Sequence, residues 1–83
     1  MKKPLKYREL RRLLKKRGII ENRVRGKGSE RIFVGYVEGR MVTYPTKCHN
    51  DGDEKPVPVI DAIRRAFHLA EKNGVSDRDF YAK

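Results

Sequence analysis

A carboxylate and a histidine, Glu30 and His49, are residues of the types that act as general base and general acid. Glu30 follows the turn Gly26-Lys27-Gly28-Ser29, whose backbone N–H groups could face a phosphate. Cleavage through the 2′-hydroxyl needs a base on that hydroxyl, an acid on the leaving oxygen and cations on the phosphate. Glu30 could serve as the base and His49 as the acid. The cations that could hold the phosphate are Arg25, Lys27 and Arg31. The alternative is that Glu30 is a surface strand residue paired with Arg25 or Arg31, and that the domain has no catalytic activity.

Other chemistries lack the residues or the spacing that they need. A structural zinc site takes four ligands at characteristic spacing, and only Cys48, His49 and His68 are available. We therefore predict no metal site and no cofactor, and interpret Cys48 as an ordinary or half-buried loop thiol. His68 is expected to pack, partly exposed, beside the apolar stripe of the second helix. The glycine-rich turn lacks the Gly-x4-Gly-Lys-Ser/Thr spacing of a nucleotide-binding loop, and it precedes a strand.

Positive charge is concentrated in the first third of the chain. Residues 1–28 contain twelve Lys and Arg against two acidic residues, whereas residues 29–83 contain nine of each, so the first part alone accounts for the net charge of +10. This asymmetry favours a polyanionic partner, because each neutralised phosphate releases condensed counterions. We predict that RNA is bound by residues of the first helix, the first turn and the strand after it: Lys6, Arg8, Arg11, Arg12, Lys15, Lys16, Arg23, Arg25, Lys27, Ser29 and Arg31.

The composition argues against other classes of protein. No apolar run is long enough to span a bilayer, and the basic segment lacks the Trp or Phe that an interfacial helix would insert. Cys48 is the only cysteine, which excludes an internal disulfide and favours a reducing compartment. A DNA-binding regulator would need base-reading side chains on a recognition helix, and the second helix offers little beyond Arg64 and Arg65. We expect a cytoplasmic protein that binds RNA.

Hydrophobic spacing predicts two helices that could position these residues. The first has Pro4 in its first turn, Gly18 as its stop, and one apolar face formed by Tyr7, Leu10, Leu13 and Leu14. The second is predicted from about Val59 to Asn73, with Gly74 as its stop and an apolar face formed by Ile60, Ile63, Phe67 and Ala70. A capping box at Ser76 predicts one short terminal turn, with Phe80 or Tyr81 folded onto the core.

Three strands are predicted between the helices, at residues 19–25, 31–37 and 40–44. The 31–37 segment is rich in β-branched and aromatic residues, Glu38-Gly39 makes a tight connection, and Pro45 ends the third strand. Residues 46–55 are expected to form a polar loop. The chain of 83 residues is thus predicted to be one α+β domain, 1–83, ordered α-β-β-β-α. Its antiparallel sheet would carry both helices on one face, with a shared core that includes Leu10, Leu14, Ile63 and Phe67.

The chain resembles the HicA family of toxins over nearly its whole length, from about Tyr7 to Tyr81. The stretch from Arg25 to Phe33, the run Val42-Thr43-Tyr44-Pro45 followed by His49, the second helix, and the ending from Gly74 to Phe80 carry the resemblance. The Gly-Ser-His motif of that family reads Gly28-Ser29-Glu30 in this sequence. The loop after Pro45 is longer and more acidic than usual, and the second helix is about one turn longer.

The resemblance implies a fold like that of double-stranded-RNA-binding domains, and a small ribonuclease that a HicB antitoxin neutralises. Glu30 stands at the position of the family's catalytic histidine, so activity does not simply carry over. Two alternatives stay open: an RNA-binding toxin with endoribonuclease activity, and a non-catalytic nucleic-acid-binding domain or inactive toxin relative. For a basic toxin, the resemblance implies an acidic, HicB-like antitoxin as its protein partner.

Overall fold

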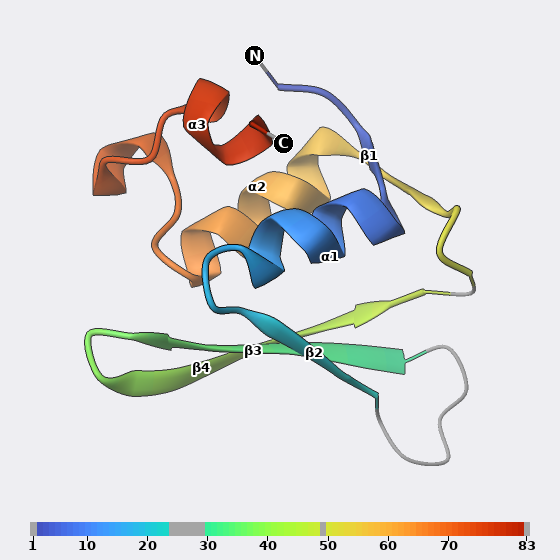
Figure 1. The fold of residues 1–83 in the computed structure, drawn as a ribbon, viewed down its shortest axis with the longest axis horizontal. Coiled ribbons are helices and arrows are strands. Elements are labelled where there is room, and N and C mark those ends of the chain that lie inside the picture. The colour runs from blue at the N-terminus through green and yellow to red at the C-terminus, as the bar shows by residue number, and fades with distance from the viewer. Residues whose placement is uncertain (1, 24–29, 49, 83) are drawn as a thin grey trace.

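Two helices cover one face of a three-stranded sheet. The computed structural model describes residues 2–23, 30–48 and 50–82, and only the backbone of Arg23. Along the chain the elements are β1 (Leu5–Lys6), α1 (Tyr7–Lys15), β2 (Ile20–Arg23), β3 (Glu30–Val37), β4 (Arg40–Lys47), β5 (Glu54–Lys55), α2 (Val57–Ala66), a 3₁₀ turn (Glu71–Asn73) and α3 (Asp77–Tyr81). α1 and α2 lie on the same side of the sheet (Figure 1). The predicted α+β architecture with an antiparallel β2-β3-β4 sheet is confirmed.

The helix α1 forms because its apolar residues share one face, and that face is buried as predicted. Tyr7, Leu10, Leu13 and Leu14 are all buried, and the Glu9 carboxylate accepts the Lys6 N–H at the first turn. The helix begins at Tyr7, so the placement of Pro4 in its first turn was wrong. The reason is that β1 pairs with β5, with Leu5 opposite Lys55. The sequence pattern did not predict this pairing. This pairing holds the chain extended up to the start of α1.

The third strand does not end at Pro45, contrary to the prediction, because β4 continues to Lys47. Val37 and Arg40 close the β3–β4 hairpin around Glu38 and Gly39, both of which have positive φ, as the tight turn requires. Antiparallel pairs alternate between hydrogen-bonded and non-hydrogen-bonded positions from that closing pair. Pro45 and Ile32 therefore form a non-hydrogen-bonded pair, in which the nitrogen of Pro45 points away from β3. Because β4 is an edge strand, proline is tolerated there.

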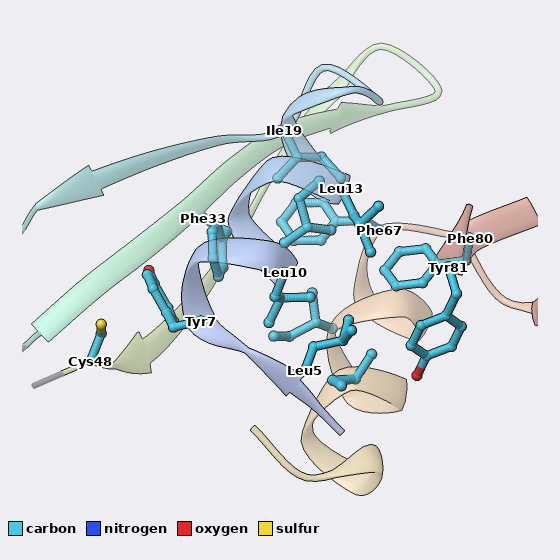
Figure 2. Close-up of a cluster of buried hydrophobic side chains, with 13 residues drawn as sticks. Leu5, Tyr7, Leu10, Leu13, Ile19, Phe33, Cys48, Phe67, Phe80 and Tyr81 are labelled. Carbon is cyan, nitrogen blue, oxygen red and sulfur yellow. The ribbon is translucent and has the colours of Figure 1, made fainter. Parts of the chain in front are cut away.

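The core joins both helices to the inner face of the sheet. Leu10, Leu14, Ile63 and Phe67 are buried in one cluster, which confirms the predicted helix faces (Figure 2). Phe80 and Tyr81 are buried in the same cluster, also as expected. Gly35 on β3 lies under the end of α2, and a Cβ there would stand 2.8 Å from Ile19 Cγ1 and 3.2 Å from Phe67 Cε1. The absence of a side chain at this position lets α2 approach the sheet closely.

The second helix is shorter than predicted, because α2 ends at Ala66 instead of continuing to Asn73. His68 adopts a left-handed φ of 55° and is exposed beyond the helix end, and the Leu69 N–H turns back to the Arg64 carbonyl. Arg64 holds this reversal in place. Its guanidinium donates to the carbonyls of Leu69 and Val75, each at 3.0 Å, and to Asp77 Oδ1 at 2.7 Å. Gly74, the predicted stop, ends the 3₁₀ turn instead, at φ 90°.

The last helix starts where the sequence predicts. The Ser76 hydroxyl accepts the Asp79 N–H at 3.1 Å, as a capping residue does. The face of the sheet away from the helices stays open, as expected. It carries exposed apolar side chains on all three strands, namely Ile20, Tyr36 and Met41.

Candidate nucleic-acid interface

A cationic groove of about 850 Å³ runs along α1 and is closed on one side by the start of β2. The buried stripe of α1 forces the intervening positions outward, so basic residues at helical spacing line the groove. Lys6, Arg8, Arg12 and Lys15 are exposed there, and Arg11 is half-buried. The remaining lining residues are Glu9, Ile19, Ile20 and Glu21. Five of the residues predicted to bind RNA are therefore gathered on one surface.

Arg11 differs from its neighbours because two carboxylates hold it. Its NH1 and NH2 groups donate to the two carboxylate oxygens of Asp51, each at 2.9 Å. Glu21 Oε1 lies 3.6 Å from NH1 on the buried side, and the guanidinium stands over the Tyr7 ring, 5.6 Å from its centroid. The hydrogen bonds to Asp51 raise the pKa of Arg11 above its usual range. The Arg11 charge is thus already compensated within the protein.

Glu21 connects the groove to the core. Its carboxylate accepts a hydrogen bond from the Tyr7 hydroxyl and lies 3.6 Å from the Nε of Arg31, with its side chain only 12% exposed. Burial raises the pKa of Tyr7 well above its ordinary value, and the bond to Glu21 raises that pKa further. A buried tyrosine hydroxyl needs a partner, and Glu21 is this partner. Sequence reasoning missed Glu21, because an acidic residue next to the apolar Ile20 in an alternating strand is expected to face solvent, whereas here Ile20 is exposed and Glu21 faces inward.

Two basic residues at the end of α1 lie on a different surface. Lys16 Nζ donates to the Ala82 carbonyl at 3.2 Å, and an NH2 group of Arg17 donates to the Asp79 carbonyl at 3.2 Å. Both residues line a smaller hollow with Leu13 and Phe80. The structure therefore separates Lys16 from the other predicted RNA-binding residues of α1. Lys16 instead links the end of α1 to the C-terminal segment.

Glu30 and Arg31 point to opposite faces of the sheet. Glu30 is half-buried at the start of β3, opposite Lys47, and lines a hollow with Ile32 and Pro45. Arg31 alternates to the helix-covered face, where its guanidinium approaches Glu21 and donates to the Glu30 carbonyl at 3.0 Å. Its side chain is 12% exposed. Glu30 does not line the α1 groove.

Several predicted site residues cannot be placed relative to these. Arg25, Lys27, Ser29 and His49 lie outside the described residues, as does the side chain of Arg23. Cys48 is fully buried, instead of half-buried as expected, and its thiol donates to the Asn50 carbonyl at 3.1 Å. Burial raises the pKa of this thiol. Within residues 2–23, 30–48 and 50–82, no three His, Cys, Asp or Glu side chains gather as a metal site would require.

Comparisons with known proteins identify no relative of this chain. Among the described residues, no helix has the length and apolar character needed to cross a bilayer. No family model matches the chain, and no match is found among curated proteins or solved structures.

Proposed function

We propose that this domain binds RNA through the groove along α1. The observation that carries the proposal is the exposure of Lys6, Arg8, Arg12 and Lys15 along one groove, while the opposite side of the same helix is buried. Three of these cations, Arg8, Arg12 and Lys15, are at helical spacing on α1, and Lys6 lies just before it. Such a row can follow a phosphate backbone, and counterion release makes each contact favourable. Phosphate contacts of this kind position a nucleic acid without reading its bases.

The order of the elements supports double-stranded RNA as the ligand. α1, the β2-β3-β4 sheet and α2 follow the α-β-β-β-α order expected from the resemblance to HicA toxins, whose fold is like that of double-stranded-RNA-binding domains. A duplex of RNA is recognised by its shape, phosphates and 2′-hydroxyls, with little base specificity. On this proposal the domain is a HicA-like toxin of the cytoplasm, with an acidic HicB-like antitoxin as its protein partner.

Salt dependence tests the proposed groove. Replacing Arg8, Arg12 and Lys15 together by Gln should weaken binding to a short RNA duplex and lower the slope of log K against log salt by about 1 for each cation that is lost. The measurement is fluorescence anisotropy at several salt concentrations. The matched control replaces Arg40, Arg65 and Lys72, which are exposed and remove the same charge away from the groove. Equal losses in the two triple variants would refute the groove as the binding surface.

Catalysis is tested at Glu30, which stands at the position of the HicA histidine. If the domain cleaves RNA with Glu30 as the base, Glu30→Ala should lose cleavage while its affinity for RNA stays near that of the native chain. The assay is incubation of the pure protein with total RNA, followed on a gel. Cleavage that persists in Glu30→Ala would eliminate this base. Cleavage that appears only in Glu30→His would favour the alternative, a non-catalytic relative that lost its chemistry with the histidine.

A further inference from the structure

We infer that Arg11 is a phosphate-binding position that the protein's own Asp51 occupies in the absence of RNA. This inference rests on the proposed function, because it concerns the same groove. The two parallel N–H···O bonds of 2.9 Å between Arg11 and Asp51 are the fork geometry with which a guanidinium also binds phosphate. The Asp51 carboxylate therefore stands where two oxygens of an RNA phosphate would bind.

Arg11 is positioned from its buried side, independently of Asp51. The Glu21 carboxylate lies 3.6 Å from NH1, and the guanidinium stands over the ring of the buried Tyr7. These contacts stay in place if the Asp51 side chain rotates away. The Arg11 side chain is 31% exposed and lines the groove, so its outward edge can meet a ligand. A guanidinium held in this way loses little freedom when it binds a phosphate.

The loop that carries Asp51 is fixed by its backbone. The Asp51 carbonyl accepts the Arg8 N–H at 3.1 Å, and the Asp53 carbonyl accepts the Tyr7 N–H at 2.7 Å. Asn50 closes the loop by accepting the Gly52 N–H on its side chain at 2.8 Å. These bonds hold the loop against the first turn of α1 through atoms that a side-chain rotation leaves untouched. The carboxylate itself is 55% exposed, so it can move into water, and ion pairs this exposed contribute little to stability.

Local charge explains why this contact matters for binding. Arg11 and Arg31 face the two carboxylates of Glu21 and Asp51, so this part of the groove has no excess positive charge although its neighbours are cations. An approaching phosphate must displace Asp51 before Arg11 can contribute. The contact therefore lowers the affinity of the free domain for RNA. A substitution that removes the Asp51 carboxylate should therefore raise the affinity for RNA.

A double-mutant cycle on duplex RNA binding tests the inference. Asp51→Asn keeps the shape of the side chain and removes its charge, so it should tighten binding several-fold and steepen the salt slope by about 1, the value for one added phosphate contact. Arg11→Gln should weaken binding less in the native background than in the Asp51→Asn background, because displacing Asp51 offsets part of what the Arg11–phosphate contact contributes. In the Asp51→Asn background, the same Arg11→Gln change should abolish the gain. Such non-additivity is the signature of two residues that act as one unit.

The matched control is Glu71→Gln, an exposed acidic position in the 3₁₀ turn after α2, away from the groove, whose replacement changes the net charge equally. A gain in Glu71→Gln equal to that in Asp51→Asn, or a gain in Asp51→Asn that survives the loss of Arg11, would overturn the inference. Asp51→Ser repeats the test if the Asn variant melts at a lower temperature than the native chain. The Arg8, Arg12 and Lys15 triple variant separates the two proposals. If it loses binding while Asp51→Asn gains nothing, the groove stands and only this inference fails; a native chain that does not bind RNA refutes both.

Discussion

Replacing Arg64 by Met should lower the free energy of unfolding by about 3–5 kcal/mol, the range for removing one partner of a buried ion pair. Arg64 is 2% exposed, and its guanidinium holds two backbone carbonyls and one carboxylate. It also stacks over the Phe80 ring at 4.7 Å. Without it, the carbonyls of Leu69 and Val75 lose their donors in the interior, and the reversal after α2 loses its support. Urea unfolding followed by circular dichroism measures the loss.

A second variant and a pH series test this expectation further. Arg64→Lys keeps the charge but cannot reach three acceptors. Its free energy of unfolding should therefore lie between those of the native chain and Arg64→Met. The hydrogen bond from Arg64 lowers the pKa of Asp77 below its ordinary value of 3.8. A lowered carboxyl pKa stabilises the fold above the unfolded pKa and ceases to do so as the pH falls through the folded value. The native chain should therefore lose this part of its stability below about pH 4, and Arg64→Met should lack that dependence. A native-like stability of Arg64→Met would show that the guanidinium does not hold the C-terminal segment.

Truncating Leu14 should cost about 2–5 kcal/mol, because Leu14 is fully buried where α1 meets the rest of the core. The loss combines the transfer of the leucine side chain with the cavity that Ala leaves behind. It would be a large fraction of the roughly 5–15 kcal/mol that stabilises a domain. Leu14→Met nearly conserves volume and should cost less than about 1.5 kcal/mol. Arg12→Ala, an exposed change on the same helix, should stay within about 0.5 kcal/mol of the native value. Equal urea midpoints for Leu14→Ala and Arg12→Ala would contradict the assignment of the buried face.

The sequence pattern predicted the structural features that depend on residues close together in the chain. The apolar spacing of α1 located its buried face and, by elimination, the exposed cations Arg8, Arg12 and Lys15. The β-branched and aromatic residues of β3 and the Glu38-Gly39 turn predicted the hairpin. These elements are specified by periodicity and turn chemistry within a few residues.

Predictions that required distant partners went wrong or were not made. The helical spacing of α2 continues past Ala66, but Arg64 takes acceptors up to thirteen residues away and turns the chain back. The rule that proline ends a strand failed at Pro45, because only the order of the strands shows that β4 is at an edge. In the groove, Arg11 meets Asp51 across forty residues, so a count of charges could not show that its charge is compensated.

The position of Pro45 also affects whether two molecules can pair through their edge strands. An edge strand presents a row of unpaired N–H and C=O groups on which a second chain can build an intermolecular sheet. The outward-facing nitrogen of Pro45 has no hydrogen to donate, and the charged Arg40 and Lys47 stand at the two ends of β4. A strand from another molecule would therefore meet a gap in the ladder and a repelling charge at each end. β4 is poorly suited to start aggregation, even though the open face beside it carries exposed apolar side chains.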